Sequence, residues 1–269
     1  FVDLCSLPEI SRREVLEKAA AEAQRSLHLG EGPLLRVILF DLGPEQGQRL
    51  LIVVHHLAID GVSWRILLDD LWTAYQQKRR GDSIDLPDKT TSFKRWAERL
   101  TEYAQEAELD AEKPYWLSPQ RRSIPALPVD LRRGENSEGS IKPVIVALDE
   151  EQTEQLLRKV PEIYGTQIND VLLTAFAQAV APWTGSTAVL LDLEGHGREE
   201  LFEDVDITRT VGWFTAVYPI VLDPGAESPP GEALKAVKEQ LRAVPQRGIG
   251  YGLLRYLRDD EALRAELAA

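Results

Sequence analysis

The sequence predicts an α/β protein built as two similar lobes. Apolar, β-branched runs alternate with amphipathic helical segments along the 269 residues. Each half also contains a strand that ends in a polar turn with glycine, HHLAIDG at 55–61 and EGHGRE at 194–199. Between the halves, a stretch rich in Pro, Arg and Gly predicts a linker at 119–140, which leaves lobes at 1–118 and 141–269.

The N-terminal half begins with a helix and a hairpin. Apolar positions at helical spacing predict a helix over 8–29, closed by Gly30. Two β-branched runs follow at 34–41 and 48–57. The segment LGPEQG between them is typical of a hairpin turn, so the two strands are expected to be antiparallel.

Two amphipathic helices complete this half. Ser63 is the expected N-cap of the first, which has a leucine- and tryptophan-rich face and ends at Gly81. The second is predicted over 92–107, from Phe, Trp and Leu residues at helical spacing.

The C-terminal half is expected to mix strands and helices without any repeat of fixed period. Pro219 should place part of the last strand at an edge or a bulge. The predicted strands are 142–148, 188–194 and 211–222, and the predicted helices are 150–160, one opened by Asn169, 232–243 and 253–268.

Composition excludes several classes of function. Lys and Arg number 31 against 44 Asp and Glu, a net charge of −13, which argues against nucleic acid as the main partner. Cys5 is the only cysteine, so an intramolecular disulfide and CxxC sites are excluded, as expected of a cytoplasmic protein. No apolar run approaches the roughly 18 residues of a membrane span. The absence of Met suggests a piece of a longer chain.

His55 and His56 are two of only 4 histidines, placed where a buried strand meets the surface. Because neighbouring side chains in a strand point to opposite faces, one is expected to face the packing and the other an open cleft. Both could be structural histidines at a strand end. The tight turn expected from Asp60 and Gly61 favours display of a general base instead.

Asp60 could itself be a base, but a carboxylate in the turn four residues beyond His56 better suits a structural anchor. A buried charge needs a partner, and Arg198 is the predicted one.

Glu194 closes an apolar strand, so its carboxylate could project into the same cleft as His56. Burial there would favour the neutral acid and make it a usable acid or base near neutral pH. An ordinary acidic residue at a strand end is the alternative. The glycines on either side of His196 allow close approach of a ligand, and His196 itself is the weaker catalytic candidate.

Other chemistries are disfavoured. Adjacent strand histidines diverge and lack the spacing of zinc ligands, so no metal is expected. A Ser-His-Asp hydrolase lacks GxSxG, and Ser63 lies in the expected cap. The glycine-rich segment 248–252 does not follow a strand as a dinucleotide loop requires.

The segment HHLAIDGVSW resembles the HHxxxDG signature of the condensation-domain superfamily of nonribosomal peptide synthetases, which is related to chloramphenicol acetyltransferase. Further segments resemble its epimerization branch in the family's order: TSFKRWAERL, EGHGREE, TRTVGWFTAVYPIVL and VPQRGIGYGLLRY. The second and third of these are the most specific. The family has more chain before FVDL and a later Phe-Asn-Tyr-Leu-Gly segment, so the two lobes are expected to be incomplete at both ends.

The resemblance implies two acetyltransferase-like lobes in a V-shape, with a tunnel between them. A peptidyl carrier protein would deliver an aminoacyl or peptidyl thioester on its 4'-phosphopantetheine, and the domain would bind no cofactor of its own. His56 and Glu194 would then be catalytic, with Asp60 and Arg198 tying the lobes together, and His55, Gly61 and Ser63 in supporting roles. Glu194 would transfer the α-proton, with His56 as its opposite-face partner or as the stabiliser of the enolate oxygen.

Three functions remain open at this stage. An epimerase acting on the α-carbon is the leading interpretation. A condensation catalyst would use His56 for the incoming amine and would not need Glu194. A degenerate domain that only docks a carrier protein is the third.

Overall fold

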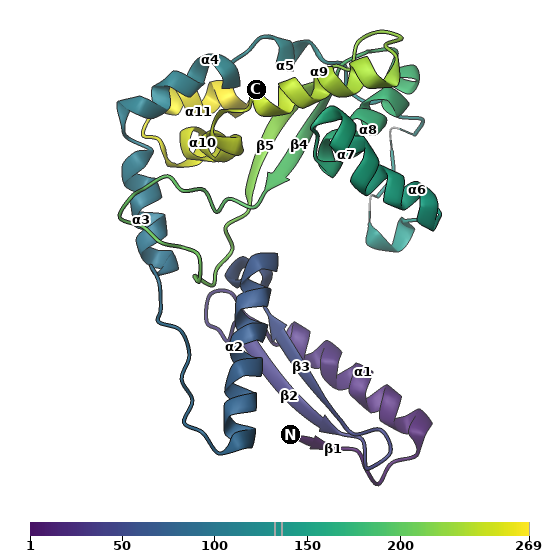
Figure 1. Ribbon diagram of the computed structural model, residues 1–269, viewed down its shortest axis with the longest axis vertical. Coiled ribbons are helices and arrows are strands. Elements are labelled where there is room, and N and C mark those ends of the chain that lie inside the picture. The colour runs from purple at the N-terminus through teal and green to yellow at the C-terminus, as the bar shows by residue number, and fades with distance from the viewer. Residues whose placement is uncertain (132, 136, 269) are drawn as a thin grey trace. The chain divides into compact units, whose positions relative to one another are not determined.

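The computed structural model describes residues 1–131, 133–135 and 137–268. It has the predicted mixture of helices and strands (Figure 1). The first compact unit contains Phe1–Glu98 and Glu200–Thr215, and the second contains Arg99–Glu199 and the chain from Ala216 on. The predicted lobes and the linker at 119–140 stay predictions, and residues 132 and 136 of that linker lie outside the described residues, as does residue 269.

The sheet of the first unit confirms the predicted hairpin. Its order is β1 (Val2–Asp3), β2 (Leu35–Asp41), β3 (Gln48–Val54). β2 and β3 are antiparallel, with Leu35 opposite Val54, and β1 is parallel to β2. Strand β3 ends three residues earlier than expected, so neither histidine belongs to it.

Helix α1 (Glu9–Arg25) packs against β2 and β3 (Figure 1). Leu4, Phe40 and Leu42 form the buried core there, because these apolar side chains leave water together. The helix ends at Arg25 with Ser26 as its C-cap, so the expected end at Gly30 is wrong.

The next two helices were predicted correctly in type. α2 (Gly61–Arg80) ends at Gly81, whose φ of 83° is the left-handed conformation that favours glycine. α3 (Phe93–Tyr103) begins after Ser92, whose Oγ accepts a hydrogen bond from the Arg95 N–H at 3.1 Å. It is shorter than the predicted 92–107.

Residues 200–215 return to the first unit as a loop. Their aromatic side chains pack on α3: the ring centroids of Phe214 and Phe93 lie 5.1 Å apart, and those of Phe202 and Trp96 lie 5.6 Å apart. The predicted strand at 211–222 therefore begins only at Ala216, because the backbone before it bonds to side chains instead of to a strand.

The second unit contains a two-stranded antiparallel sheet of β4 (Val189–Gly195) and β5 (Ala216–Leu222). Pro219 lies opposite Asp192 in this pairing. Helix α8 (Ile168–Thr184) contacts α9 (Pro230–Arg242), and each also contacts one strand. The remaining helical segments before α8 are η2 (Ala107–Glu112), α4 (Lys113–Trp116), α5 (Gln120–Ser123), η3 (Glu138–Ser140), α6 (Glu150–Glu154), η4 (Gln155–Lys159) and α7 (Val160–Tyr164).

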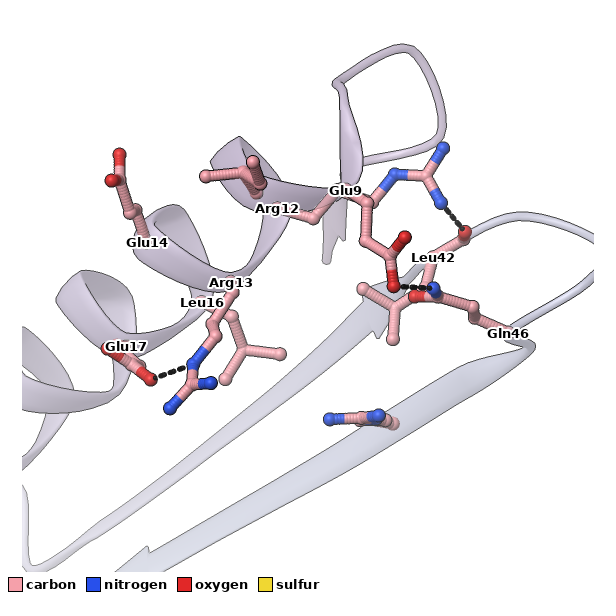
Figure 2. Close-up of a pocket in the computed structure, with 10 residues that line it drawn as sticks. Glu9, Arg12, Arg13, Glu14, Leu16, Glu17, Leu42 and Gln46 are labelled. Atoms are coloured by element: carbon pink, nitrogen blue, oxygen red, sulfur yellow. Dashed lines mark hydrogen bonds and ion pairs between the residues drawn. The ribbon is translucent and has the colours of Figure 1, made fainter.

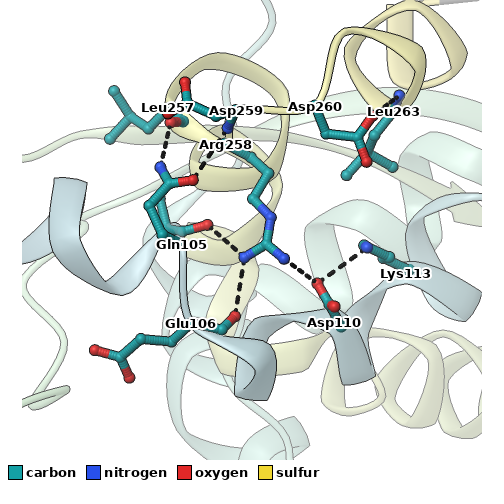
Figure 3. A network of polar contacts seen from close by, with 10 residues as sticks. Gln105, Glu106, Asp110, Lys113, Leu257, Arg258, Asp259, Asp260 and Leu263 are labelled. Atoms are coloured by element: carbon teal, nitrogen blue, oxygen red, sulfur yellow. Dashed lines mark hydrogen bonds and ion pairs between the residues drawn. The ribbon is translucent and has the colours of Figure 1, made fainter.

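The C-terminal helix expected at 253–268 is broken. After the 3₁₀ turn η5 (Pro245–Gly248), the chain forms α10 (Ile249–Gly252) and η6 (Leu253–Leu257), and α11 (Glu261–Ala268) follows separately. Arg258 at the break is extended, and its guanidinium donates to the carbonyls of Ala104 and Glu106 at 2.9 and 3.0 Å (Figure 3). It also donates to Asp110 at 3.0 Å. These bonds hold the break in place.

The predicted strand at 142–148 is wrong. This segment has no strand partner in the described part of the chain, and the side chains of Val144, Ile145 and Val146 are 86–90% exposed. A β-branched run becomes a strand only when another strand pairs with it.

Candidate functional site

His55 holds the turn that follows β3. Its backbone N–H donates to the Leu34 carbonyl at 2.8 Å, and its Nδ1 accepts the N–H of Leu57 at 3.2 Å. The ring is half-buried. The first bond continues the pairing of the two chain segments and the second closes the turn, whereas the supporting role of His55 stays a prediction.

His56 is exposed and begins the 3₁₀ turn η1 (His56–Ala58). The expectation that the two histidines diverge across a strand is wrong, because both follow the strand. The His56 ring lies edge-on to Trp213, with centroids 6.0 Å apart and an interplanar angle of 82°. Sequence reasoning missed Trp213, since it was placed inside a strand. This edge-on contact favours one orientation of the imidazole, and the ring stays exposed.

Asp60 is 7% exposed and is the N-cap of α2. One carboxylate oxygen accepts the Ser63 N–H at 2.7 Å, and the other accepts the N–H of Phe214 at 3.3 Å. The predicted N-cap, Ser63, is wrong, because a cap residue must precede the helix whose N–H groups it accepts from. Gly61 is the first helical residue and not half of a separate turn.

Ser63 is fully buried. Its Oγ donates to the Gly212 carbonyl at 2.9 Å and accepts the Gly212 N–H at 3.0 Å. A Cβ on Gly212 would lie 2.3 Å from the Phe93 ring, so the segment approaches α3 as closely as a glycine allows. Ser63 therefore ties α2 to the returning segment.

Glu194 lies on β4 opposite Val217 in the second unit. Its side chain is exposed, on the same face as Leu190 and Asp192. The predicted cleft shared with His56 would involve both units and stays a prediction. Among the described residues, no hydrogen bond or ion pair engages the Glu194 side chain, so its carboxylate is free to meet a ligand.

The loop after Glu194 is held by local bonds. The Nδ1 of His196 accepts the Arg198 N–H at 3.0 Å, and Gly197 has a φ of 64° that favours glycine. Arg198 is half-buried. Its predicted pairing with Asp60 would join the two units and stays a prediction.

Sequence reasoning missed Glu199 and Arg247. The Glu199 side chain is 15% exposed, with Oε1 at 3.5 Å from Nε2 of His196 and Oε2 at 3.7 Å from Nη1 of Arg247. Burial raises the pKa of the Tyr218 hydroxyl, and the negative charge of Glu199 raises it further. The two loops that meet here are 48 positions apart (247 − 199), and neither had a local signal that pointed to the other.

A groove between α1 and the β2–β3 turn lies away from these residues (Figure 2). Two of its cations are already bonded: Arg12 donates to the Leu42 carbonyl at 2.7 Å, and Arg13 pairs with Glu17 at 2.7 Å. None of the predicted site residues lines this groove.

In the described ranges, no three His, Cys, Asp or Glu side chains are grouped so that they could hold a metal ion. No helix in these ranges has both the length and the apolar character to cross a membrane.

Comparisons with known proteins identify relatives along almost the whole chain. The condensation-domain family model matches residues 3–267. One linear gramicidin synthase subunit of Brevibacillus parabrevis is 53% identical over 261 residues, which are 97% of this chain and 3% of that protein. Another subunit of the same synthase is 50% identical over 268 residues, 99% of this chain and 5% of that protein. The chain thus spans a small part of these relatives.

Among solved structures, the epimerization domain from the third module of tyrocidine synthetase B matches with a TM-score of 0.87 and 41% identity. The match covers 97% of this chain and 59% of that one. The first condensation domain of the CDA synthetase matches with a TM-score of 0.66 and 21% identity, over 92% of this chain and 54% of that one. The second likeness supports the fold alone.

Proposed function

The chain belongs to the condensation-domain family of nonribosomal peptide synthetases, and on this premise we propose that it is an epimerization domain. Its reaction would convert the L α-carbon of an aminoacyl or peptidyl thioester into the D configuration. The observation that supports this most is the 41% identity with an epimerization domain over 97% of this chain. The exposed Glu194 agrees with it, because condensation chemistry has no need of a carboxylate there.

The reaction requires two proton transfers at one carbon. A base removes the α-proton, and the C–H electron pair moves into the thioester carbonyl to give an enolate. A proton is then returned to the opposite face as the carbonyl re-forms, so the product has the same atoms as the substrate. A thioester suits this step, because its enolate is better stabilised than that of an acid or an amide.

Glu194 and His56 are the residues that we propose for this chemistry. Glu194 has an exposed carboxylate without a protein partner among the described residues. His56 presents an exposed imidazole that Trp213 orients. Glu194 would transfer the α-proton, and His56 would either serve the opposite face or donate a hydrogen bond to the enolate oxygen.

The substrate is proposed to arrive on the 4'-phosphopantetheine of a peptidyl carrier protein, within a larger synthetase. The relatives are subunits of such synthetases. The domain itself needs no cofactor for this reaction, because both protons can pass through ionisable side chains.

Deuterium exchange tests the proposal. The module that contains this chain is supplied with an L-aminoacyl carrier protein in D₂O, and α-deuterium and the D/L ratio are followed. Epimerization predicts that deuterium enters as the D form accumulates, and that both cease in Glu194→Gln. Retention of the L form without deuterium would overturn the proposal.

Condensation is the second candidate, because the family model that matches is named for it and HHLAIDG has the required first motif. Adding a second carrier protein loaded with an acceptor amino acid distinguishes the two. Peptide bond formation without α-exchange would establish condensation. If neither reaction occurs, docking of a carrier protein is the remaining function.

A further inference from the structure

The direction of the Glu194 carboxylate is set through its backbone. No hydrogen bond or ion pair to the side chain occurs within the described residues, so nothing holds the carboxylate directly. Leu193 lies opposite Tyr218 in the sheet, and Gly195 lies opposite Ala216. Strand pairing ends at Gly195, so the loop that follows it must be held in place if the end of β4 is to present Glu194 in one direction.

A strained turn lies against this loop. Gln246 and Arg247 have φ values of 41° and 53°, which residues with a Cβ rarely adopt. A Cβ built on Gly195 would lie 3.5 Å from the Arg247 carbonyl oxygen and 3.5 Å from the Tyr218 ring. The backbone of the turn is thus in contact with the residue next to Glu194.

The surroundings enforce the strain. The Gln246 side-chain amide donates to the Tyr103 hydroxyl at 2.8 Å, and Tyr103 is buried. Gly248 has a φ of 90°, and its position leaves no room for a Cβ beside the Tyr218 ring. Strain of this kind persists only where neighbours over-determine it, and it gathers at functional sites.

The ion pair of Glu199 and Arg247 joins the loop to the turn. The Glu199 carboxylate is mostly buried and lies between His196 of its own loop and Arg247 of the turn. The Arg247 side chain is 74% exposed, so losing it would not open a core. Removing the Arg247 side chain therefore breaks the link between loop and turn without creating a cavity.

We infer that Glu199 and Arg247 are positioning residues for Glu194, which hold residues 195–199 against the turn at 246–248. This inference rests on the proposed function of Glu194. The glycine-rich segment VPQRGIGYG, which had no role from the sequence alone, thereby supports the carboxylate that transfers the proton.

The test compares single-turnover α-deuterium exchange in the module and its variants Glu199→Gln, Arg247→Gln and the double variant. Each single change should slow exchange about tenfold or more, because small misplacements of a reacting group are costly. The double variant should be no slower than either single one, since both remove the same link. Arg247→Lys should recover part of the rate, and Glu200→Gln, an exposed neighbour, should react as the parent does.

Two further measurements distinguish a loss of positioning from a loss of folded protein. The concentration of loaded carrier that gives half the maximal rate, and the thermal unfolding midpoint, should stay at parental values in the single variants. A parental exchange rate in Glu199→Gln and Arg247→Gln would overturn the inference, and so would a loss of rate matched by a fall in the midpoint. Glu194→Gln is measured alongside: if it exchanges at the parental rate, the proposed function itself fails.

Discussion

In the first unit, Asp60 and Ser63, which follow β3, are built into the fold, whereas in the second unit Glu194 near the end of β4 and His196 after it remain in solvent. Asp60 and Ser63 are 7% and 0% exposed and bond to the backbone of residues 212–214. Glu194 and His196 are exposed, and Glu199 lies 3.5 Å from His196 in the loop that follows β4.

The difference separates two uses of polar residues. A buried polar group that is hydrogen-bonded contributes to stability, and losing its partner is costly. An exposed group that is oriented through its backbone contributes little to stability and stays available for chemistry. The residues of the first motif, HHLAIDG at 55–61, thus mostly hold chain segments together. His56 differs from them because its side chain is exposed.

The largest effect on stability is expected at Gly248, in the turn at 246–248. Gly248→Ala places a Cβ about 2.0 Å from the Tyr218 ring at a φ of 90°. Left-handed strain of about 1 kcal/mol and overpacking of about 3 kcal/mol should lower the free energy of unfolding. Urea titration measures it. Gly252→Ala is the control: this helical glycine has open space around it, so the change should stabilise by about 0.5 kcal/mol.

Asp60→Ala should be the next largest. The variant loses the cap of α2, about 1 kcal/mol, and leaves the buried Phe214 N–H without its acceptor, about 2 kcal/mol more. Asp69→Ala changes an exposed acid on the same helix and should stay within about 0.5 kcal/mol of the parent. Equal effects of the two changes would contradict the structural role of Asp60.

A smaller effect is expected at Glu112, the buried acid of the second unit. Burial raises its pKa, partly offset by the hydrogen bond that Trp116 donates at 2.7 Å. The folded protein then binds this proton more tightly than the unfolded chain, so unfolding free energy should fall as pH rises above the ordinary value of 4.5 through the raised pKa.

Glu112→Gln should abolish that part of the pH dependence and stabilise the protein at neutral pH by on the order of 1 kcal/mol. Unfolding curves between pH 4 and 8 would show it, with the exposed Glu108→Gln as the matched control. The same slope in both variants would mean that Glu112 is not its source.

The smallest effect on stability is expected where chemistry is proposed. Glu194→Gln and His56→Ala change exposed side chains and should each change the free energy of unfolding by less than about 0.5 kcal/mol. A fall of more than about 1 kcal/mol in the unfolding free energy of Glu194→Gln would contradict the contrast drawn between the two units.

Local rules predicted much of this fold, because its signals were local. The hairpin of β2 and β3 and the end of α2 at Gly81 follow from a turn sequence and a C-cap glycine. The failures depend on distant partners. Residues 142–148 have strand composition but no strand to pair with in the described part of the chain, and Ser63 bonds to Gly212, which is 149 positions away.

The candidate site shows the same limit. The motif residues were identifiable by type and spacing, and the capping role of Asp60 could have been read from its place before α2. The meeting of Glu199 with Arg247, and that of His56 with Trp213, comes only from the folded chain. The exposure of Glu194 likewise depends on which face of β4 is covered.

The most direct test of the role proposed for Glu194 is α-proton exchange in Glu194→Gln, measured separately from the L and the D substrate. Carrier proteins loaded with the L and with the D substrate are incubated separately in D₂O, and α-deuterium and interconversion are measured beside the unfolding midpoint. We predict that interconversion is lost in both directions, that exchange is lost from at least one configuration, and that the midpoint is unchanged. Interconversion at the parental rate would contradict the assignment of proton transfer to Glu194.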